Sequence, residues 1–218
     1  MPDKMPDKIP DKIPDKPHFE LRENGPLVVK GLDRLVDADG NDIEVKPVMA
    51  LCRCGNSKSK PFCDGSHKTV GFKSTGGEAA GRDRLITYEG SEITVTYNPR
   101  LCSHAAECGR LAGAVFNPGQ KPWIQPDNGT VAEVEAVVAA CPSGALALAG
   151  GQHLVEERAT LQIQKDGPYW VQQSEIDAGP AGVGASAQKF VLCRCGLSGN
   201  KPYCDGSHRD AGWTDSPD

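Results

Sequence analysis

Two segments of this 218-residue chain carry the same metal-binding side chains at the same spacing. Each reads Cys-x-Cys-x8-Cys-x3-His, and the second copy lies 141 positions after the first. The two sets are Cys52, Cys54, Cys63 and His67, and Cys193, Cys195, Cys204 and His208. Three thiolates and one imidazole form a complete ligand shell for zinc or for one iron–sulfur cluster. In a two-iron cluster, the Cys-x-Cys pair can serve one iron and the later Cys and His the other.

The residues beside these ligands suit such a site. Asp64 and Asp205 follow the third cysteine, where each can accept amide hydrogen bonds and cap a helix that carries the histidine. Gly65 and Gly206 come next and permit a positive φ and close approach to a bulky inorganic core. The full pattern, C-x-C-x2-S-x3-P-x-C-D-G-S-H, occurs twice and resembles the CDGSH iron–sulfur domain family. The resemblance covers about half the chain and implies one 2Fe–2S cluster in each set.

A histidine ligand has two expected consequences. Imidazole is neutral where thiolate is negative, so it raises the reduction potential. Protonation of the ligating nitrogen removes the ligand, so the two clusters are expected to be acid-labile with a pH-dependent potential. The alternative for both sets is a structural zinc ion, because three cysteines and one histidine are also a regular zinc set.

The remaining cysteines, Cys102, Cys108 and Cys141, form a third group. Bacterial ferredoxins use C-x2-C-x2-C and a distant Cys-Pro, whereas the middle position is Ala105 here. The surrounding segment resembles divergent single-cluster ferredoxins, which implies a 3Fe–4S or a 4Fe–4S cluster. His104 is then either a fourth ligand or a surface histidine. The alternative for the whole group is three buried, inert cysteines.

Each CDGSH copy is expected to contain a short β-rich lead, a loop and a second strand before its cysteines. The leads are residues 19–30 and 161–172, and the second strands are 48–51 and 190–192. The glycine- and alanine-rich loop 175–188 is expected to be mobile. Between the copies, the patterns predict a hairpin (85–88 and 93–97), helices (104–114 and 131–140) and a strand (146–148).

These elements predict an α+β chain in four parts. The parts are a disordered Pro-Asp-Lys repeat tail (1–17), a first CDGSH domain (18–75), a ferredoxin-like domain (84–150) and a second CDGSH domain (158–216). A piece of about 50 residues can bury little core alone. The two CDGSH units are therefore expected to pack together as an intrachain pseudo-dimer in a monomer, with the ferredoxin-like insert between them.

Composition excludes several classes of protein. The nine cysteines are an odd number, so they cannot all pair in internal disulfides. The net charge of −5 argues against nucleic-acid binding. No run approaches the about 18–20 apolar residues of a membrane helix, and the first residues lack a signal-peptide pattern. The expectation is a cytoplasmic protein with no membrane segment.

The predicted function is electron transfer with a protein redox partner. Cluster storage or transfer to a protein acceptor, or redox or pH sensing, is the alternative. An enzyme is not expected, because the sequence has no nucleotide-binding glycine pattern after a strand and no nucleophile elbow. All nine cysteines are assigned to cluster sites, so no cysteine is left to act as a nucleophile.

Overall fold

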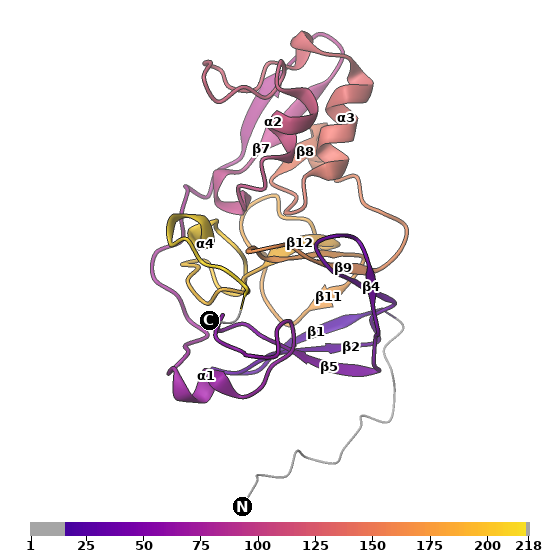
Figure 1. Ribbon diagram of the computed structural model, residues 1–218. Helices are drawn as coiled ribbons and strands as arrows, with labels where there is room; N and C mark the ends of the chain where they lie inside the picture. Colours follow the sequence, from indigo (N-terminus) through magenta and orange to yellow (C-terminus); the bar gives the residue numbers. More distant parts are fainter. Residues whose placement is uncertain (1–15, 217–218) are drawn as a thin grey trace, which may run out of the picture.

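The computed structural model describes residues 16–216, which form three small β-sheets and four short α-helices (Figure 1). Residues 1–15 of the predicted disordered tail lie outside the described residues. The strands are β1 His18–Leu21, β2 Leu27–Lys30, β3 Arg34–Val36, β4 Asp42–Ile43, β5 Val48–Leu51, β6 Ile86–Glu89, β7 Thr94–Tyr97, β8 Leu146–Leu148, β9 Thr160–Ile163, β10 Tyr169–Gln172, β11 Glu175–Ile176 and β12 Lys189–Leu192. The helices are α1 Ser66–Thr69, α2 Glu107–Ala112, α3 Val131–Ala140 and α4 Ser207–Asp210. Within residues 16–216, no helix has the length and apolar character needed to cross a membrane.

The two CDGSH copies exchange strands. One sheet has the order β11-β1-β2-β5, and a second has the order β12-β10-β9-β3-β4. The second copy's β11 pairs parallel with β1, and the first copy's β3 pairs parallel with β9. Each copy therefore completes the other's sheet, which confirms the predicted intrachain pseudo-dimer and the α+β fold class.

The exchanged sheets enclose one apolar core that both copies share. Burial alternates along β2 and β10, as expected for strands with one face toward the core. The ring of Phe190 makes edge-on contacts with two others. Its centroid is 6.0 Å from that of Phe19 and 6.4 Å from that of Tyr203. Tyr169 is fully buried, and its hydroxyl donates to Cys52 O at 2.9 Å. The core thus supports a ligand loop of one copy with a side chain from the other.

The loop expected at 175–188 begins with a strand instead. Glu175 and Ile176 form β11, and the backbone amides of Glu175 and Asp177 donate to Pro17 O and Phe19 O at 2.8 and 3.0 Å. Two residues carry too little alternation to signal a strand in the sequence. Pairing with β1, more than 150 positions earlier, determines this conformation.

The central segment is a three-stranded antiparallel sheet, β6-β7-β8, with α2 and α3 packed beside it (Figure 1). Helix α3 has the predicted bounds and begins with a capping box between Thr130 and Glu133. The helix predicted at 104–114 is shorter, because His104 and Ala106 have positive φ angles of 56° and 64°. Such angles interrupt a right-handed helix, so α2 begins only at Glu107.

Candidate functional site

The four ligands of each CDGSH motif lie together as two pairs. In the first set, the sulfurs of Cys52 and Cys54 are 3.7 Å apart, and Cys63 Sγ is 3.3 Å from His67 Nδ1. In the second set, the same two distances are 3.7 and 3.6 Å. On one tetrahedral metal, two sulfurs lie about 3.8 Å apart, and a sulfur and an imidazole nitrogen about 3.5 Å apart. Each pair therefore has the spacing of two ligands on a shared metal. Two pairs of ligands in each set can supply two ligands to each of two metal atoms, the arrangement expected for a two-iron cluster.

Hydrogen bonds inside the Cys-x-Cys pairs favour one thiolate in each. The thiol of Cys54 bonds to Cys52, which lowers the pKa of Cys52 and raises the pKa of Cys54. The same bond lowers the pKa of Cys193 and raises the pKa of Cys195. Because thiolates are the metal ligands, each pair presents one ligand that deprotonates more readily than an ordinary cysteine.

The aspartates accept the predicted amide hydrogen bonds, but the N-cap residue of each short helix is Gly65 or Gly206 and not the aspartate before it. The carboxylate of Asp64 accepts hydrogen bonds from two backbone amides at 2.8 and 2.9 Å, and that of Asp205 from two at 2.8 and 3.1 Å. In each motif one of these amides opens the helix that carries the histidine. Gly65 and Gly206 have φ angles of 93° and 90°, so both turns use the predicted left-handed conformation.

The arginine between the first two cysteines anchors each ligand loop, a role that the ligand spacing does not predict. Arg53 is 4% exposed and donates to the backbone oxygens of Gly25 and Arg22 at 3.0 and 2.7 Å. Arg194 is 1% exposed, makes the equivalent bonds at 2.8 and 2.6 Å and also pairs with Asp215. Both arginines bond to the Asn/Asp-Gly-Pro turn of their own copy. The sequence signal for this contact is that both copies carry Cys-Arg-Cys together with the Asn/Asp-Gly-Pro turn.

The two Cys-x-Cys loops touch each other. A Cβ on Gly55 would overlap Cys195 O, and one on Gly196 would lie 2.9 Å from Cys54 O. Trp213 Nε1 also donates to Gly55 O at 3.4 Å. The backbones of the first and second ligand sets are therefore in van der Waals contact.

We expect Gly55→Ala to lower the free energy of unfolding by about 2–5 kcal/mol. A side chain at its φ of 77° costs about 1–2 kcal/mol, and the clash with the Cys195 backbone adds about 1–3 kcal/mol. Gly40→Ala is the matched control, because its φ of 85° is similar, nothing lies within 4 Å of the added Cβ, and it lies in the turn between β3 and β4, away from the ligands in the sequence. Denaturant unfolding of the holo-protein measures both variants. Equal losses would contradict close packing of the two loops.

The third group of cysteines also comes together. Cys102, Cys108 and Cys141 line one cavity of the central segment, together with Tyr97 and His104. Burial raises the pKa of Cys102 and Cys108, and the nearby thiols raise it further. Burial and the same thiols also raise the pKa of Tyr97. The structure thus gathers three thiols around one space, with His104 at its rim.

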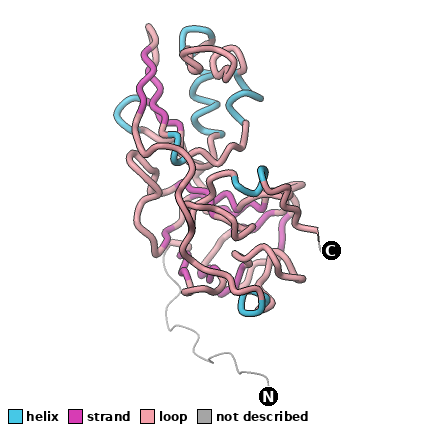
Figure 2. The backbone as a smooth tube through the Cα atoms, turned by 90° about the vertical axis from the view of Figure 1, so that its left-hand side faces the viewer, coloured by secondary structure: helices cyan, strands magenta, loops and turns pink. Residues whose placement is uncertain are grey.

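His104 links this cavity to the second CDGSH set. A Cβ on Gly206 would lie 2.7 Å from His104 Cδ2, so the imidazole packs directly on the CDGSH turn. Cys204 lines a second, smaller cavity with Leu101, the neighbour of Cys102, and Ser143, two residues after Cys141. In space, the second CDGSH set therefore lies between the first set and the central group, as the heights of α1, α4 and α2 show in Figure 1. Figure 2, turned about the vertical axis, keeps the same order.

This position makes the two CDGSH sets unequal. Cys204 and His208 are only 4% and 7% exposed, whereas Cys63 and His67 are half-buried. The central segment covers the second set, and α1 carries the first set at the opposite end of the molecule (Figure 1). The identical motifs do not predict this difference, because it arises from what packs on each copy.

Lys189 joins the second CDGSH unit to the central segment. Its side chain is fully buried in β12, and its Nζ donates to Val138 O, Ala139 O and Leu154 O at 2.8, 3.1 and 2.8 Å. Two of these carbonyls belong to the end of α3, just before Cys141, where the helix dipole favours a cation. Burial lowers the pKa of Lys189, because it disfavours the charged form. The hydrogen bonds to the three carbonyls stabilise the ammonium group in this position. Nothing in the sequence marks this lysine.

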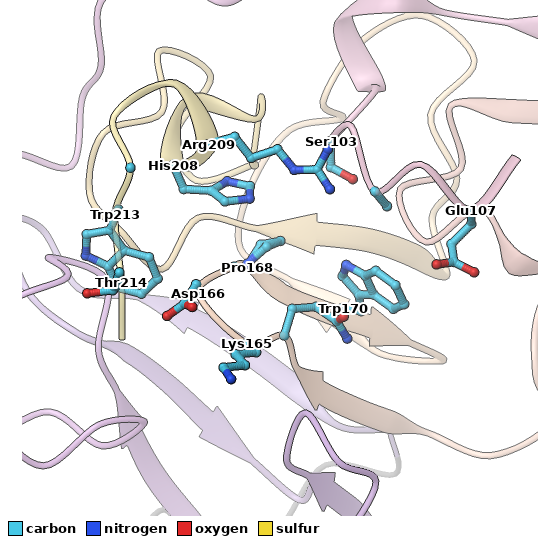
Figure 3. Close-up of a pocket in the computed structure, with 14 residues that line it drawn as sticks. Ser103, Glu107, Lys165, Asp166, Pro168, Trp170, His208, Arg209, Trp213 and Thr214 are labelled. Carbon is cyan, nitrogen blue, oxygen red and sulfur yellow. The ribbon is translucent and has the colours of Figure 1, made fainter. Parts of the chain in front are cut away.

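A cavity of about 490 Å³ lies between the second set and the central segment (Figure 3). His208 and Arg209 point into it from α4, and Trp170 enters from β10. Lys165, Asp166 and Glu107 also line it, so its charges are mixed.

Comparisons with known proteins agree with these sites. A family model described as "Iron-binding zinc finger CDGSH type" matches residues 24–68 and 166–209, and one described as "Divergent 4Fe-4S mono-cluster" matches residues 88–150. The Escherichia coli K12 protein named "Uncharacterized protein YjdI" is 48% identical over 59 residues, which are 27% of this chain and 78% of that protein. The "CDGSH iron-sulfur domain-containing protein 2 homolog" of Drosophila sechellia is 32% identical over 100 residues, which are 44% of this chain and 68% of that protein.

Proposed function

This chain belongs to the CDGSH iron–sulfur domain family, and on that premise we propose that it transfers electrons. It binds iron–sulfur clusters through its CDGSH domains and its divergent 4Fe–4S domain. In the proposal, each CDGSH set holds one 2Fe–2S cluster. The partner is a protein redox carrier, and the chain itself is not an enzyme.

The central cavity is proposed to hold one cluster bound by Cys102, Cys108 and Cys141. The matching family is a 4Fe–4S family, whereas three thiolates without a fourth cysteine also suit 3Fe–4S. His104 lines the cavity and is the side chain available as a fourth ligand for the four-iron form. EPR of the protein as purified separates the two forms, because only a 3Fe–4S cluster is expected to give a signal before reduction.

The observation that carries electron transfer is the contact between neighbouring ligand sets. The first set touches the second through Gly55 and Gly196, and the second touches the central group through Gly206 and His104. When bound, iron–sulfur clusters supply one-electron redox chemistry. A buried middle set is out of reach of an acceptor protein that would take its cluster, whereas an electron can pass to it through the contacts with its neighbours. The surrounding residues hold the ligands in place and shield the middle set from water.

Redox cycling tests this proposal against cluster donation. We expect the visible and EPR spectra of the holo-protein to return fully after anaerobic reduction and reoxidation. Incubation with an apo-ferredoxin is expected to leave the clusters where they are. A spectrum of holo-ferredoxin on the acceptor, with matching loss from this protein, would favour the alternative of cluster storage and transfer.

A further inference from the structure

The segment that carries Cys63 and His67 of the first CDGSH set is basic, although the chain as a whole has a net charge of −5. Residues 56–73 carry four lysines and one aspartate. The lysines are Lys58, Lys60, Lys68 and Lys73, and all but the half-buried Lys60 are exposed. Each lies within six positions of Cys63 or His67. We call these four residues the lysine patch.

The second copy provides an internal comparison, because the same motif there has a different surface. Residues 197–214 carry two basic and two acidic side chains, so this stretch is neutral. The positions of Lys58 and Lys73 are occupied by Gly199 and Thr214 in that copy. Lys60 and Lys68 have the basic counterparts Lys201 and Arg209, so Lys58 and Lys73 are the two lysines peculiar to the first copy.

Exposure and charge coincide at the first set. Its Cys63 and His67 are half-buried, whereas the matching residues of the second set are buried. Val70, at the end of α1, is 49% exposed and lies between Lys68 and Lys73 in the chain. In protein–protein contacts apolar side chains lie at the centre and polar ones at the rim, the positions that Val70 and the neighbouring lysines would take under a docked partner.

We propose that the first CDGSH set, with the lysine patch around it, is the docking surface for an acidic electron-carrier protein. This inference rests on the proposed function. One electron passes between the first set and the docked carrier, and no covalent bond forms or breaks. The buried second set is then reached from the first through the contact at Gly55 and Gly196, and the central group through His104.

The cavity beside His208 is the competing entry point. It borders the second set directly, but its lining includes the basic Lys165 and Arg209 and the acidic Asp166 and Glu107. Mixed charge gives no preference for an acidic or a basic carrier. The lysine patch has such a preference, and the sign of the preference can be measured.

The experiment compares two double variants of the holo-protein that have the same net charge. Lys58→Glu/Lys68→Glu reverses two charges in the lysine patch. The control, Lys46→Glu/Lys121→Glu, reverses two exposed charges elsewhere. Lys46 precedes β5, at the end of that strand away from Cys52, and Lys121 lies in the central segment. Unchanged visible spectra establish that both variants carry their clusters.

Two carriers of opposite charge are the probes, mixed at low ionic strength in a stopped-flow instrument. A reduced acidic plant-type ferredoxin donates to the oxidised protein, and oxidised basic cytochrome c accepts from the reduced protein. We expect the patch variant to react about tenfold more slowly than wild type with ferredoxin and faster with cytochrome c. The rate constants of the control variant are expected to change by less than about threefold. In 0.5 M salt the differences between the variants should disappear, because salt screens the charges.

Two outcomes would overturn the docking proposal. One is an equal response of both double variants, which would show that only net charge matters. The other is slowing by Lys165→Glu/Arg209→Glu and not by the patch variant, which would place entry at the cavity. In both cases reversible redox cycling would still support electron transfer, so the two proposals fail separately.

Discussion

Replacing Lys189 by methionine is expected to lower the free energy of unfolding by about 2–4 kcal/mol. The substitution takes the donor from one buried carbonyl oxygen, that of Val138, and from two partly buried ones, those of Ala139 and Leu154. Each loss costs about 1–3 kcal/mol where the oxygen is buried and less where water can reach it. Relief of the lysine's own desolvation returns part of this cost. Because two of the carbonyls end α3, the loss is expected to loosen the helix just before Cys141. Denaturant unfolding and the iron content of the purified protein measure the two effects.

Lys30→Met is the matched control for this prediction. Lys30 is also a strand lysine, but its ammonium group pairs with Glu20 near the surface, where its side chain is 23% exposed. Such pairs contribute about 0–1 kcal/mol. If both variants lose the same small amount, Lys189 does not hold the central segment on the second CDGSH unit.

The ligand sets could be predicted because their chemistry is contiguous in the sequence. Sixteen residues contain each complete CDGSH set, with the aspartate and glycine that shape its turn, and the structure brings these ligands together as pairs. The capping box at Thr130 fixed the start of α3 for the same reason, since all of its parts lie within four residues. Local patterns of this kind need no knowledge of the rest of the chain.

Features that depend on distant packing could not be predicted in this way. Strand β11 is two residues long and exists because β1 pairs with it. Lys189 is a charged residue in a buried strand, and its burial is explained by its hydrogen bonds to carbonyl oxygens of α3, which lies about 50 positions earlier in the sequence. The order of the sites was hidden too, because the central cysteines lie between the motifs in sequence but at one end in space (Figure 1). Even the two identical motifs differ, since Cys204 is buried and Cys63 is not.

Removal of the clusters by a chelator under reducing conditions is expected to unfold the ligand loops and spare the shared sheets. The core of the CDGSH pair is apolar and contains no ligand side chain. Its fourteen buried residues are all Phe, Leu, Val, Met, Ile or Tyr. Metal sites of small domains contribute folding energy directly. If the clusters contribute about 5 kcal/mol, the melting temperature falls by about 10–20 °C.

Hydrogen exchange of the apo-protein is the measurement, because it resolves the loops from the sheets. We expect protection to fall in residues 52–72 and 193–213 and to persist in β2, β5, β10 and β12. Retention of protection in both loops, with an unchanged melting temperature, would show that packing alone holds the ligand sites.

The two copies should respond unequally to this treatment. In the second loop, His104 packs on Gly206 and buried Arg194 forms an ion pair with Asp215. In the first loop, Arg53 has no acidic partner among the described residues. Exchange should therefore rise more in 52–72 than in 193–213. Because the motifs are the same, the difference measures what packing against the central segment adds to the second site. Equal exchange in the two loops would mean that the clusters alone order both, and that burial of the middle set depends on them.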